Sequence, residues 1–199
     1  MRSASLIASA LLCAGIASAG NITLVSSRAA ISATDTIDWS TQGNEFDVKT
    51  SGTTVGCNAF TLSGASVLTL FSGSTYAADF LATDTVLAAF DVANAGAIPG
   101  AIRITFATAV GAAGAQLQIT TFGLPFTGVL EAFGTSGSFG TVSLAGLSVP
   151  NPPSGDGSAP FIGIRSDLTD IIAIEFRTAN DGTAINNVSI GAAALVKSL

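Results

Sequence analysis

The fold class is decided by a train of short apolar runs: IRITF (residues 102–106), AQLQITTF (115–122), GVLEAF (128–133), GTVSLAG (140–146), FIGIR (161–165) and DIIAIEF (170–176). Glycine-rich breaks separate the runs, and in most of them every second residue is apolar. This is the period of a β-strand with one buried face. Short strands at this spacing, with turn residues between them, predict an all-β fold, namely a single antiparallel β-sandwich.

The rest of the chain continues this pattern less regularly. Small residues in VGAAGA (110–115) predict a bend or bulge, SGTT (51–54) predicts a turn, and no fixed-period repeat or linker indicates a second domain. We expect further strands over residues 21–26, 31–39, 46–50 and 185–190, a hairpin of strands 57–62 and 67–71, and two strand segments within 75–90 that break at 82–84.

The first nineteen residues have the composition of a secretory signal peptide. Arg2 gives a positive start, Leu6–Ile16 is the apolar stretch, and Ala17–Ala19 supplies the small residues before a cleavage position. The apolar stretch is far shorter than the ~20 residues that a membrane span requires. We therefore expect cleavage before Gly20, export of the protein, and one β-sandwich domain over residues 20–199.

Charge and cysteine content exclude several classes of function. With 7 Lys and Arg against 13 Asp and Glu, the net charge is −6, so the chain has no basic surface for nucleic acid or anionic lipid. No later segment is long and apolar enough to span a membrane. Cys57 is the only cysteine left after cleavage, so it either pairs between molecules or, as we expect, is a small buried apolar residue.

A family resemblance follows from the order of several stretches. The chain resembles exported bacterial β-sandwich proteins, many of which carry a PEP-CTERM sorting tail and have jelly-roll domains similar to carbohydrate-binding modules. The resemblance implies a jelly-roll fold and no particular catalytic residues, and this chain lacks the sorting tail. The stretches that carry it are DWSTQGNEF (38–46), YAADFLATDTVLAAF (76–90), IRITFATAVGAAGAQLQ (102–118), FTGVLEAFGTSG (126–137), SAPFIGIRSDLTDIIAIEF (158–176) and INNVSI (185–190).

Catalytic chemistry has few candidate residues in this sequence. The chain contains no histidine, which excludes Ser-His-Asp and Cys-His arrangements and any ordinary zinc site. Glycosidases need two carboxylates about 5–10 Å apart, and Glu131 and Glu175 lie in expected strands on the polar side. The alternative is that both are solvated outward residues, with Glu175 beside Arg177 or Arg103.

A structural calcium ion is a second hypothesis. Calcium binds six to eight oxygens from carboxylates, amides and backbone carbonyls. Asp35, Asp38, Asp156 and Asp181 lie in loops or at strand ends, although aspartates at such positions also serve simply as turn formers.

Sugar binding is the third hypothesis. Sugar rings stack on exposed aromatic side chains, and Trp39 and Tyr76 are the only aromatic residues with a polar tip. Trp39 lies beside Asp38 and a polar turn, so it is either such a platform or a plug between the two sheets.

From these observations we expect a non-enzymatic, secreted or cell-surface module that binds carbohydrate or another extracellular partner. Two alternatives stay open. One is a glycan-active enzyme that uses Glu131 and Glu175, and the other is a structural component of the extracellular matrix that assembles through sheet edges.

Overall fold

The computed structural model describes residues 20–64, 67–71, 78–91, 96–97, 100–119, 121, 123–148, 155–179 and 182–192. The expected leader (1–19), Tyr76 and Asp181 lie outside these residues. The described elements, in chain order, are β1 (Ile22–Val25), α1 (Arg28–Ile31), β2 (Ala33–Ile37), the 3-10 helix η1 (Trp39–Thr41), β3 (Ser51–Thr53), β4 (Ala59–Gly64), β5 (Val67–Phe71), β6 (Thr85–Asp91), β7 (Gly96–Ala97), β8 (Ile102–Val110), β9 (Ala112–Ile119), β10 (Pro125–Gly134), β11 (Gly137–Leu147), β12 (Phe161–Ser166), β13 (Ile171–Thr178), β14 (Thr183–Ile185) and β15 (Val188–Gly191).

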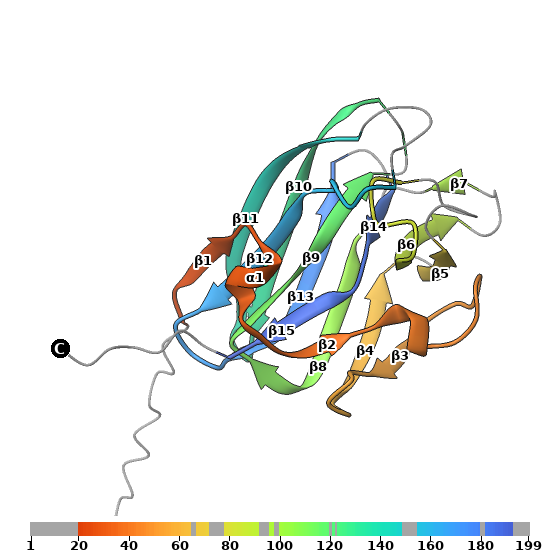
Figure 1. The fold of residues 1–199 in the computed structure, drawn as a ribbon. Coiled ribbons are helices and arrows are strands. Elements are labelled where there is room, and N and C mark those ends of the chain that lie inside the picture. Colours follow the sequence, from red (N-terminus) through yellow and green to blue (C-terminus); the bar gives the residue numbers. More distant parts are fainter. Residues whose placement is uncertain are drawn as a thin grey trace, which may run out of the picture.

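The strands form two sheets that pack face to face as an antiparallel β-sandwich (Figure 1). One sheet has nine strands, with β1-β12-β9-β14-β6-β5 as its main path and β2, β7 and β15 beside it, and the other has six in the order β11-β10-β13-β8-β4-β3. All thirteen pairings between the described strands are antiparallel. Consecutive strands repeatedly cross between the sheets, as at β8–β9 and β12–β13, which is the jelly-roll type of connection expected from the sequence.

The nine-stranded sheet forks beside β9. One edge of β9 pairs with β15 over residues 112–114 and with β14 over residues 117–119. Between these two segments the chain leaves regular pairing at Asn186 and Asn187. From there β15 continues to β2, and β14 continues to β6. The two branches therefore separate on either side of these asparagines.

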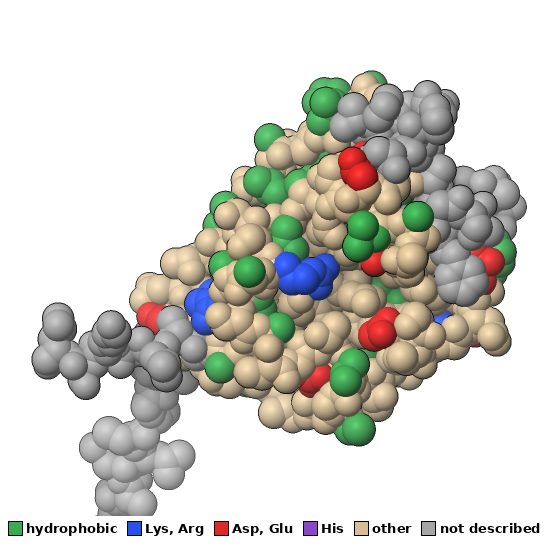
Figure 2. All heavy atoms as spheres, viewed as in Figure 1, with side chains coloured by type: hydrophobic (Ala, Val, Ile, Leu, Met, Phe, Trp, Pro, Cys, Tyr) green, Lys and Arg blue, Asp and Glu red, His purple; other side chains and the backbone are tan. Residues whose placement is uncertain are grey.

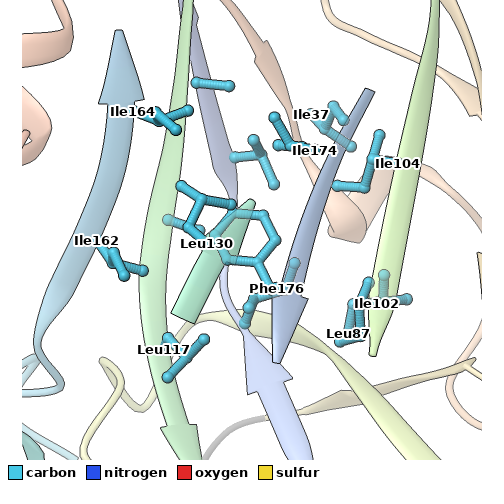
Figure 3. Packing of buried hydrophobic residues seen from close by; sticks show 14 of the residues in the cluster. Ile37, Leu87, Ile102, Ile104, Leu117, Leu130, Ile162, Ile164, Ile174 and Phe176 are labelled. Carbon is cyan, nitrogen blue, oxygen red and sulfur yellow. The ribbon is translucent and has the colours of Figure 1, made fainter. Parts of the chain in front are cut away.

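The main core lies between the two sheets. It consists of inward-facing side chains that alternate along the strands, as the sequence predicts. In Figure 3, Ile162, Ile164 and Leu117 of the nine-stranded sheet lie on one side of Leu130 and Phe176 of the six-stranded sheet. These side chains are almost fully buried.

The outer face of the nine-stranded sheet carries two smaller apolar clusters. The first lies under α1, where Ile31 packs with Val25, Ala112 and Phe161. The second groups Ala78, Phe80 and Ala159 with Leu70, Val86, Ala88 and Ala184. Helix α1 begins after Ser27, whose side chain accepts a hydrogen bond from the Ala30 amide, as N-cap serines do. The polar hollow described below is lined by Arg28 of α1 and, from the segment before β6, by Leu81 and Asp84.

The structure corrects the expected hairpin of strands 57–62 and 67–71. Strand β4 pairs with β3 and β8 in the six-stranded sheet, whereas β5 pairs with β6 in the nine-stranded sheet. Alternation indicates which side of a strand is buried, but it does not indicate which strands pair. The expected bend at 110–115 is confirmed, because the chain turns between the sheets at Gly111.

Five further expectations about elements are corrected. Residues 31–39 are divided among the end of α1, β2 and the start of η1, and residues 185–190 are divided at the fork. The expected strand 46–50 does not form as a regular strand. Residues 45 and 46 make a turn, in which Phe46 has a left-handed φ of 62° and Asp47 accepts a hydrogen bond from the Asn44 amide, and only Val48 lies in a β-bridge. Residues 51–53, expected in a turn, form β3. Within 75–90 only the second segment forms a strand among the described residues, after the expected break.

Candidate functional site: a polar hollow in the fork of the nine-stranded sheet

A hollow of about 400 Å³ opens where the nine-stranded sheet forks. We call it the fork hollow. It draws on α1, β2, the segment before β6, β9 and the fork itself, and its lining residues are Arg28, Ala33, Thr36, Leu81, Asp84, Gln116, Asn186, Asn187 and Ser189. Figure 2 shows that most of this face of the molecule is neither charged nor apolar. A group of basic side chains lies near the centre of the view, and acidic side chains lie to the right of it. Most of the lining residues are polar, in a chain of which only 10% is charged.

Asn186 is the centre of the hydrogen bonds at the hollow. Its side-chain Nδ2 donates to Asp84 Oδ2 at 2.9 Å and to Gln116 Oε1 at 2.6 Å. Its Oδ1 accepts from Arg28 Nη2 at 2.8 Å and from the Gln116 amide at 3.0 Å. Asn186 is only 4% exposed. A buried amide with all four of these bonds holds the residues around it in fixed positions.

Arg28 places a positive charge at one side of the hollow. Its Nη1 donates to the Asn187 carbonyl at 2.9 Å and to Ser189 Oγ at 2.7 Å, and its guanidinium lies 5.4 Å from the centre of the Phe161 ring. Burial lowers the pKa of Arg28 while the charge of Asp84 raises it, and the net direction is downward. An arginine remains protonated under these conditions, so Arg28 and Asp84 present opposite charges to one hollow without a direct ion pair within 4 Å.

Gln116 joins the hollow to the loop that covers the second apolar cluster. Its Nε2 donates to the Gly157 carbonyl at 2.6 Å and to the Ala159 carbonyl at 2.7 Å. Its Oε1 accepts from Asn186. Gln116 therefore links this loop to the fork, and its hydrogen bonds to both hold it in place in the lining of the hollow.

The expected carboxylate pair lies elsewhere, on the outer face of the six-stranded sheet. Glu131 of β10 is directly opposite Glu175 of β13, and Glu175 is directly opposite Arg103 of β8. Arg177 Nη1 donates to Glu131 Oε2 at 2.8 Å and to Glu175 Oε1 at 3.2 Å. Arg103 lies 3.7 Å from Glu175 and stacks 3.8 Å from the ring centre of Phe133. The structure brings the two carboxylates together, but on an outward surface with arginines between them.

The electrostatics of Glu131 do not suit acid catalysis. Hydrogen bonds from Ser138 and Arg177 lower the pKa of Glu131, against a smaller opposing effect of burial. The pKa of Arg177 is raised in turn, mainly by its hydrogen bond to Glu131. A glycosidase acid needs a carboxyl with a raised pKa, so the geometry matches the solvated-residue interpretation of Glu131 and Glu175 more closely.

Asp35, the first of the expected calcium ligands, is fully engaged with hydrogen-bond donors. Its Oδ1 accepts from the Thr36 and Gly56 amides at 2.8 and 2.7 Å. Its Oδ2 accepts from the Thr54 hydroxyl and from Asn58 Nδ2. Burial acts to raise the pKa of Asp35, but the four hydrogen bonds together lower it. The carboxylate therefore organises the 54–58 loop.

The other expected calcium ligands are dispersed. Asp38 caps η1 by accepting from the Ser40 amide and hydroxyl at 3.0 and 2.7 Å. Asp156 accepts from the Ser158 amide at 3.0 Å, which is the turn-former role. Within the described ranges, no three His, Cys, Asp or Glu side chains gather closely enough to hold a metal ion.

Trp39 is in the core and not on the surface. Its ring is 0% exposed, its Nε1 donates to the Asn186 carbonyl at 3.0 Å, and it meets the Phe60 ring edge-on at 5.9 Å. A ring without an exposed face cannot stack on a sugar, so Trp39 has the plug role considered above. Its hydrogen bond to Asn186 connects the core to the fork.

Cys57 contradicts the expectation of a buried thiol. It is exposed, and it has a left-handed φ of 65° in the loop that Asp35 holds. The Cys57 amide donates to the Thr54 carbonyl at 2.9 Å. A turn that demands this backbone conformation places the side chain at the loop tip, away from the core.

Sequence reasoning missed Arg28, Asp84, Gln116 and Asn186. Two signals were present: two glutamines alternate with apolar residues in AQLQ (115–118), and two adjacent asparagines interrupt INNVSI (185–190). Neither signal says that these residues meet, because they are far apart in the chain and the strand order brings them together.

Comparisons with known proteins assign this chain to no family. No protein-family model matches the chain, and no curated protein matches it. One solved structure with partial similarity is the enzymatically active domain of tailspike protein 4 from bacteriophage CBA120, at 15% identity and a TM-score of 0.31, covering 66% of this chain and 19% of that chain. Similarity at this level carries no argument about function. Among the described residues, no helix has the length and apolar character to cross a membrane.

Proposed function

We propose that this protein is a non-enzymatic, secreted or cell-surface module that binds neutral carbohydrate in the fork hollow. The observation that carries the proposal is the hydrogen-bonded set of Arg28, Asp84, Gln116 and Asn186 around one hollow. Sugar hydroxyls both donate and accept hydrogen bonds. A guanidinium, a carboxylate and amides in fixed positions can satisfy both roles.

Hydrogen-bonding capacity remains at both charged groups. The three hydrogen bonds of Arg28 to described residues use three of its five N–H donors. Asp84 accepts one bond at Oδ2 from Asn186, and an ionised carboxylate has about four acceptor positions. A donor group, Arg28, and an acceptor group, Asp84, thus line the same hollow.

Size and charge favour a small neutral ligand. The volume of about 400 Å³ falls within the roughly 300–1,000 Å³ typical of small-molecule sites. The opposite charges of Arg28 and Asp84 offset each other, and the chain as a whole carries a net charge of −6. An acidic glycan would be repelled by this net charge, so a neutral sugar fits better.

The test is binding of the exported protein to a panel of neutral and acidic oligosaccharides, followed by calorimetry. We expect Asp84→Ala and Arg28→Lys to weaken binding of a neutral sugar by about 10-fold or more, since each removes charge-assisted hydrogen bonds. Glu131→Gln, on the opposite face, is the matched control and should leave affinity unchanged. Circular dichroism and a melting curve verify that each variant is folded. Failure of every sugar to bind, or loss of binding in the control alone, would contradict the proposal.

A second function, structural assembly with other copies of this chain, is favoured by the edge strand β11. This strand has eleven residues, ends the six-stranded sheet and contains neither proline nor a charged residue. Edge strands that are protected against pairing with another chain usually carry a proline or a charged residue. Thr141, Ser143 and Ala145 alternate with half-buried residues, so two copies could pair antiparallel without a clash of charge.

Sedimentation over a range of protein concentrations tests the assembly hypothesis. We expect oligomers that disappear in Ser143→Lys, because like charges would then lie near one another across the shared edge. Thr61→Lys on the interior strand β4 is the control and should assemble like the wild type. A protein that stays monomeric at all concentrations would rule this function out.

A further inference from the structure

Residues Gly20 and Asn21 are fastened to the turn between β12 and β13. The Gly20 amide donates to Asp170 Oδ2 at 2.9 Å. Asn21 donates from its amide and from Nδ2 to the two oxygens of Asp167, each at 2.9 Å, and its carbonyl accepts from the Asp167 amide at 3.1 Å. Four hydrogen bonds therefore hold two residues on one turn.

A side chain at position 20 would displace the side chains around it. A Cβ there would lie 2.1 Å from Ser166 Oγ and 2.9 Å from both Asp167 Oδ1 and Asp170 Oδ2. Gly20 itself is buried. Two carboxylates thus converge on the backbone of Gly20.

One acceptor at this position has no donor. Asp170 Oδ1 is buried and has no hydrogen-bond partner among the described residues. A buried carboxylate oxygen in this state is unfavourable. The Gly20 amide cannot supply a second hydrogen, because a peptide N–H has one hydrogen and Asp170 Oδ2 already accepts it. The basic side chain on β12, Arg165, instead bonds the carbonyls of Ala30, Ile31 and Ala192.

We propose that Gly20 becomes the first residue of the protein and that its α-ammonium group pairs with the Asp170 carboxylate. The proposal rests on the leader cleavage expected from the sequence. Water hydrolyses the Ala19–Gly20 peptide bond in the leader peptidase of the exporting cell, its oxygen remains on the new Ala19 carboxylate, and the released amine of Gly20 is protonated at neutral pH. The resulting group has three N–H donors and a positive charge.

This group matches what surrounds it. One N–H keeps the bond to Asp170 Oδ2, a second becomes available for the orphaned Oδ1, and Asp167 adds a further negative charge close by. An ion pair in which the ammonium engages both Asp170 oxygens is stronger than the single hydrogen bond from the Gly20 amide that it replaces. Cleavage therefore does more than release the chain: it locks the first strand, β1, onto the edge of the sheet beside β12.

A double-mutant cycle on the purified protein tests this pairing. Four proteins are compared by thermal unfolding: the protein beginning at Gly20, the same protein with one alanine added before Gly20, and each with Asp170→Asn. For the protein that begins at Gly20, we expect Asp170→Asn to lower Tm by about 2–6 °C. In the extended protein, where the ammonium is displaced, the same substitution should have at most half that effect. Asp38→Asn, which affects only the cap of η1, is the control and should act equally in both backgrounds.

Two more measurements keep the proposal testable if Asp170→Asn does not fold. Acetylation of the Gly20 amine removes its charge without changing a side chain, and it should lower Tm relative to the free amine. Mass spectrometry of the exported protein should find Gly20 as its first residue. Equal effects of Asp170→Asn in both backgrounds, an unchanged Tm on acetylation, or a different first residue would overturn the proposal.

Discussion

The two outer faces of the sandwich differ in how their polar residues are arranged. On the six-stranded sheet, regular pairing sets Glu131, Glu175 and Arg103 in one row across adjacent strands, and the charges neutralise one another. On the nine-stranded sheet, pairing breaks at Asn186, and polar side chains surround a hollow instead of a row. An unbroken sheet yields a flat surface of mutually satisfied charges, whereas a fork yields a concave site. The candidate for function is therefore the fork.

The largest expected effect comes from the residue that supports the fork from the core. Trp39→Ala removes a fully buried ring together with its hydrogen bond to the Asn186 carbonyl. We expect the free energy of unfolding to fall by about 3–5 kcal/mol. Denaturant unfolding measures this, and acrylamide should quench the native tryptophan fluorescence poorly. Strong quenching and unchanged stability would place the ring on the surface.

Removing the central residue of each face gives the most direct comparison of stability. Asn186→Ala leaves Arg28, Gln116 and Asp84 with unmet hydrogen bonds in a partly buried setting, and should cost about 1–3 kcal/mol. Arg177→Ala breaks ion pairs on a partly exposed surface, and should cost about 0–1 kcal/mol. Urea titrations under one set of conditions check both values. If Arg177→Ala costs more than Asn186→Ala, the contrast drawn between the two faces is wrong.

Acid should weaken the six-stranded face through Glu131. Its pKa in the folded protein lies below the ordinary value of 4.5, so the folded state favours the ionised form. The resulting stability is present above about pH 4.5 and is lost as the pH falls through the lowered pKa. Glu131→Gln should therefore be less stable than the wild type at pH 7 and equal to it near pH 2. A constant difference across this pH range would contradict the ion-pair account.

The smallest effect concerns the exposed loop held by Asp35. Cys57 should react with a thiol reagent in the folded protein within minutes, because its side chain is exposed. Cys57→Ser should change stability by no more than about 0.5 kcal/mol. A thiol that reacts only after denaturant is added would show that the Cys57 side chain is buried, as the sequence analysis expected.

The sequence predicts the fold further than it predicts the site. Alternation in IRITF (102–106) and DIIAIEF (170–176) correctly indicates which faces are buried, because burial follows from local spacing. The false hairpin of 57–62 with 67–71 shows the limit, since pairing depends on the whole sheet. The fork hollow lies beyond that limit. Arg28, Asp84, Gln116 and Asn186 meet only when β9 pairs with β14 and β15 together.

The central claim, that ligand binds at the fork, is tested most directly by nuclear magnetic resonance. A neutral oligosaccharide that binds in the panel is titrated into isotope-labelled protein, and the shifts of the backbone amides are mapped. We predict the largest changes at residues 81–84, at Gln116 and at 186–189, with none at 129–133 or 175–177. Changes concentrated on the six-stranded face, or spread evenly over both faces, would contradict the account.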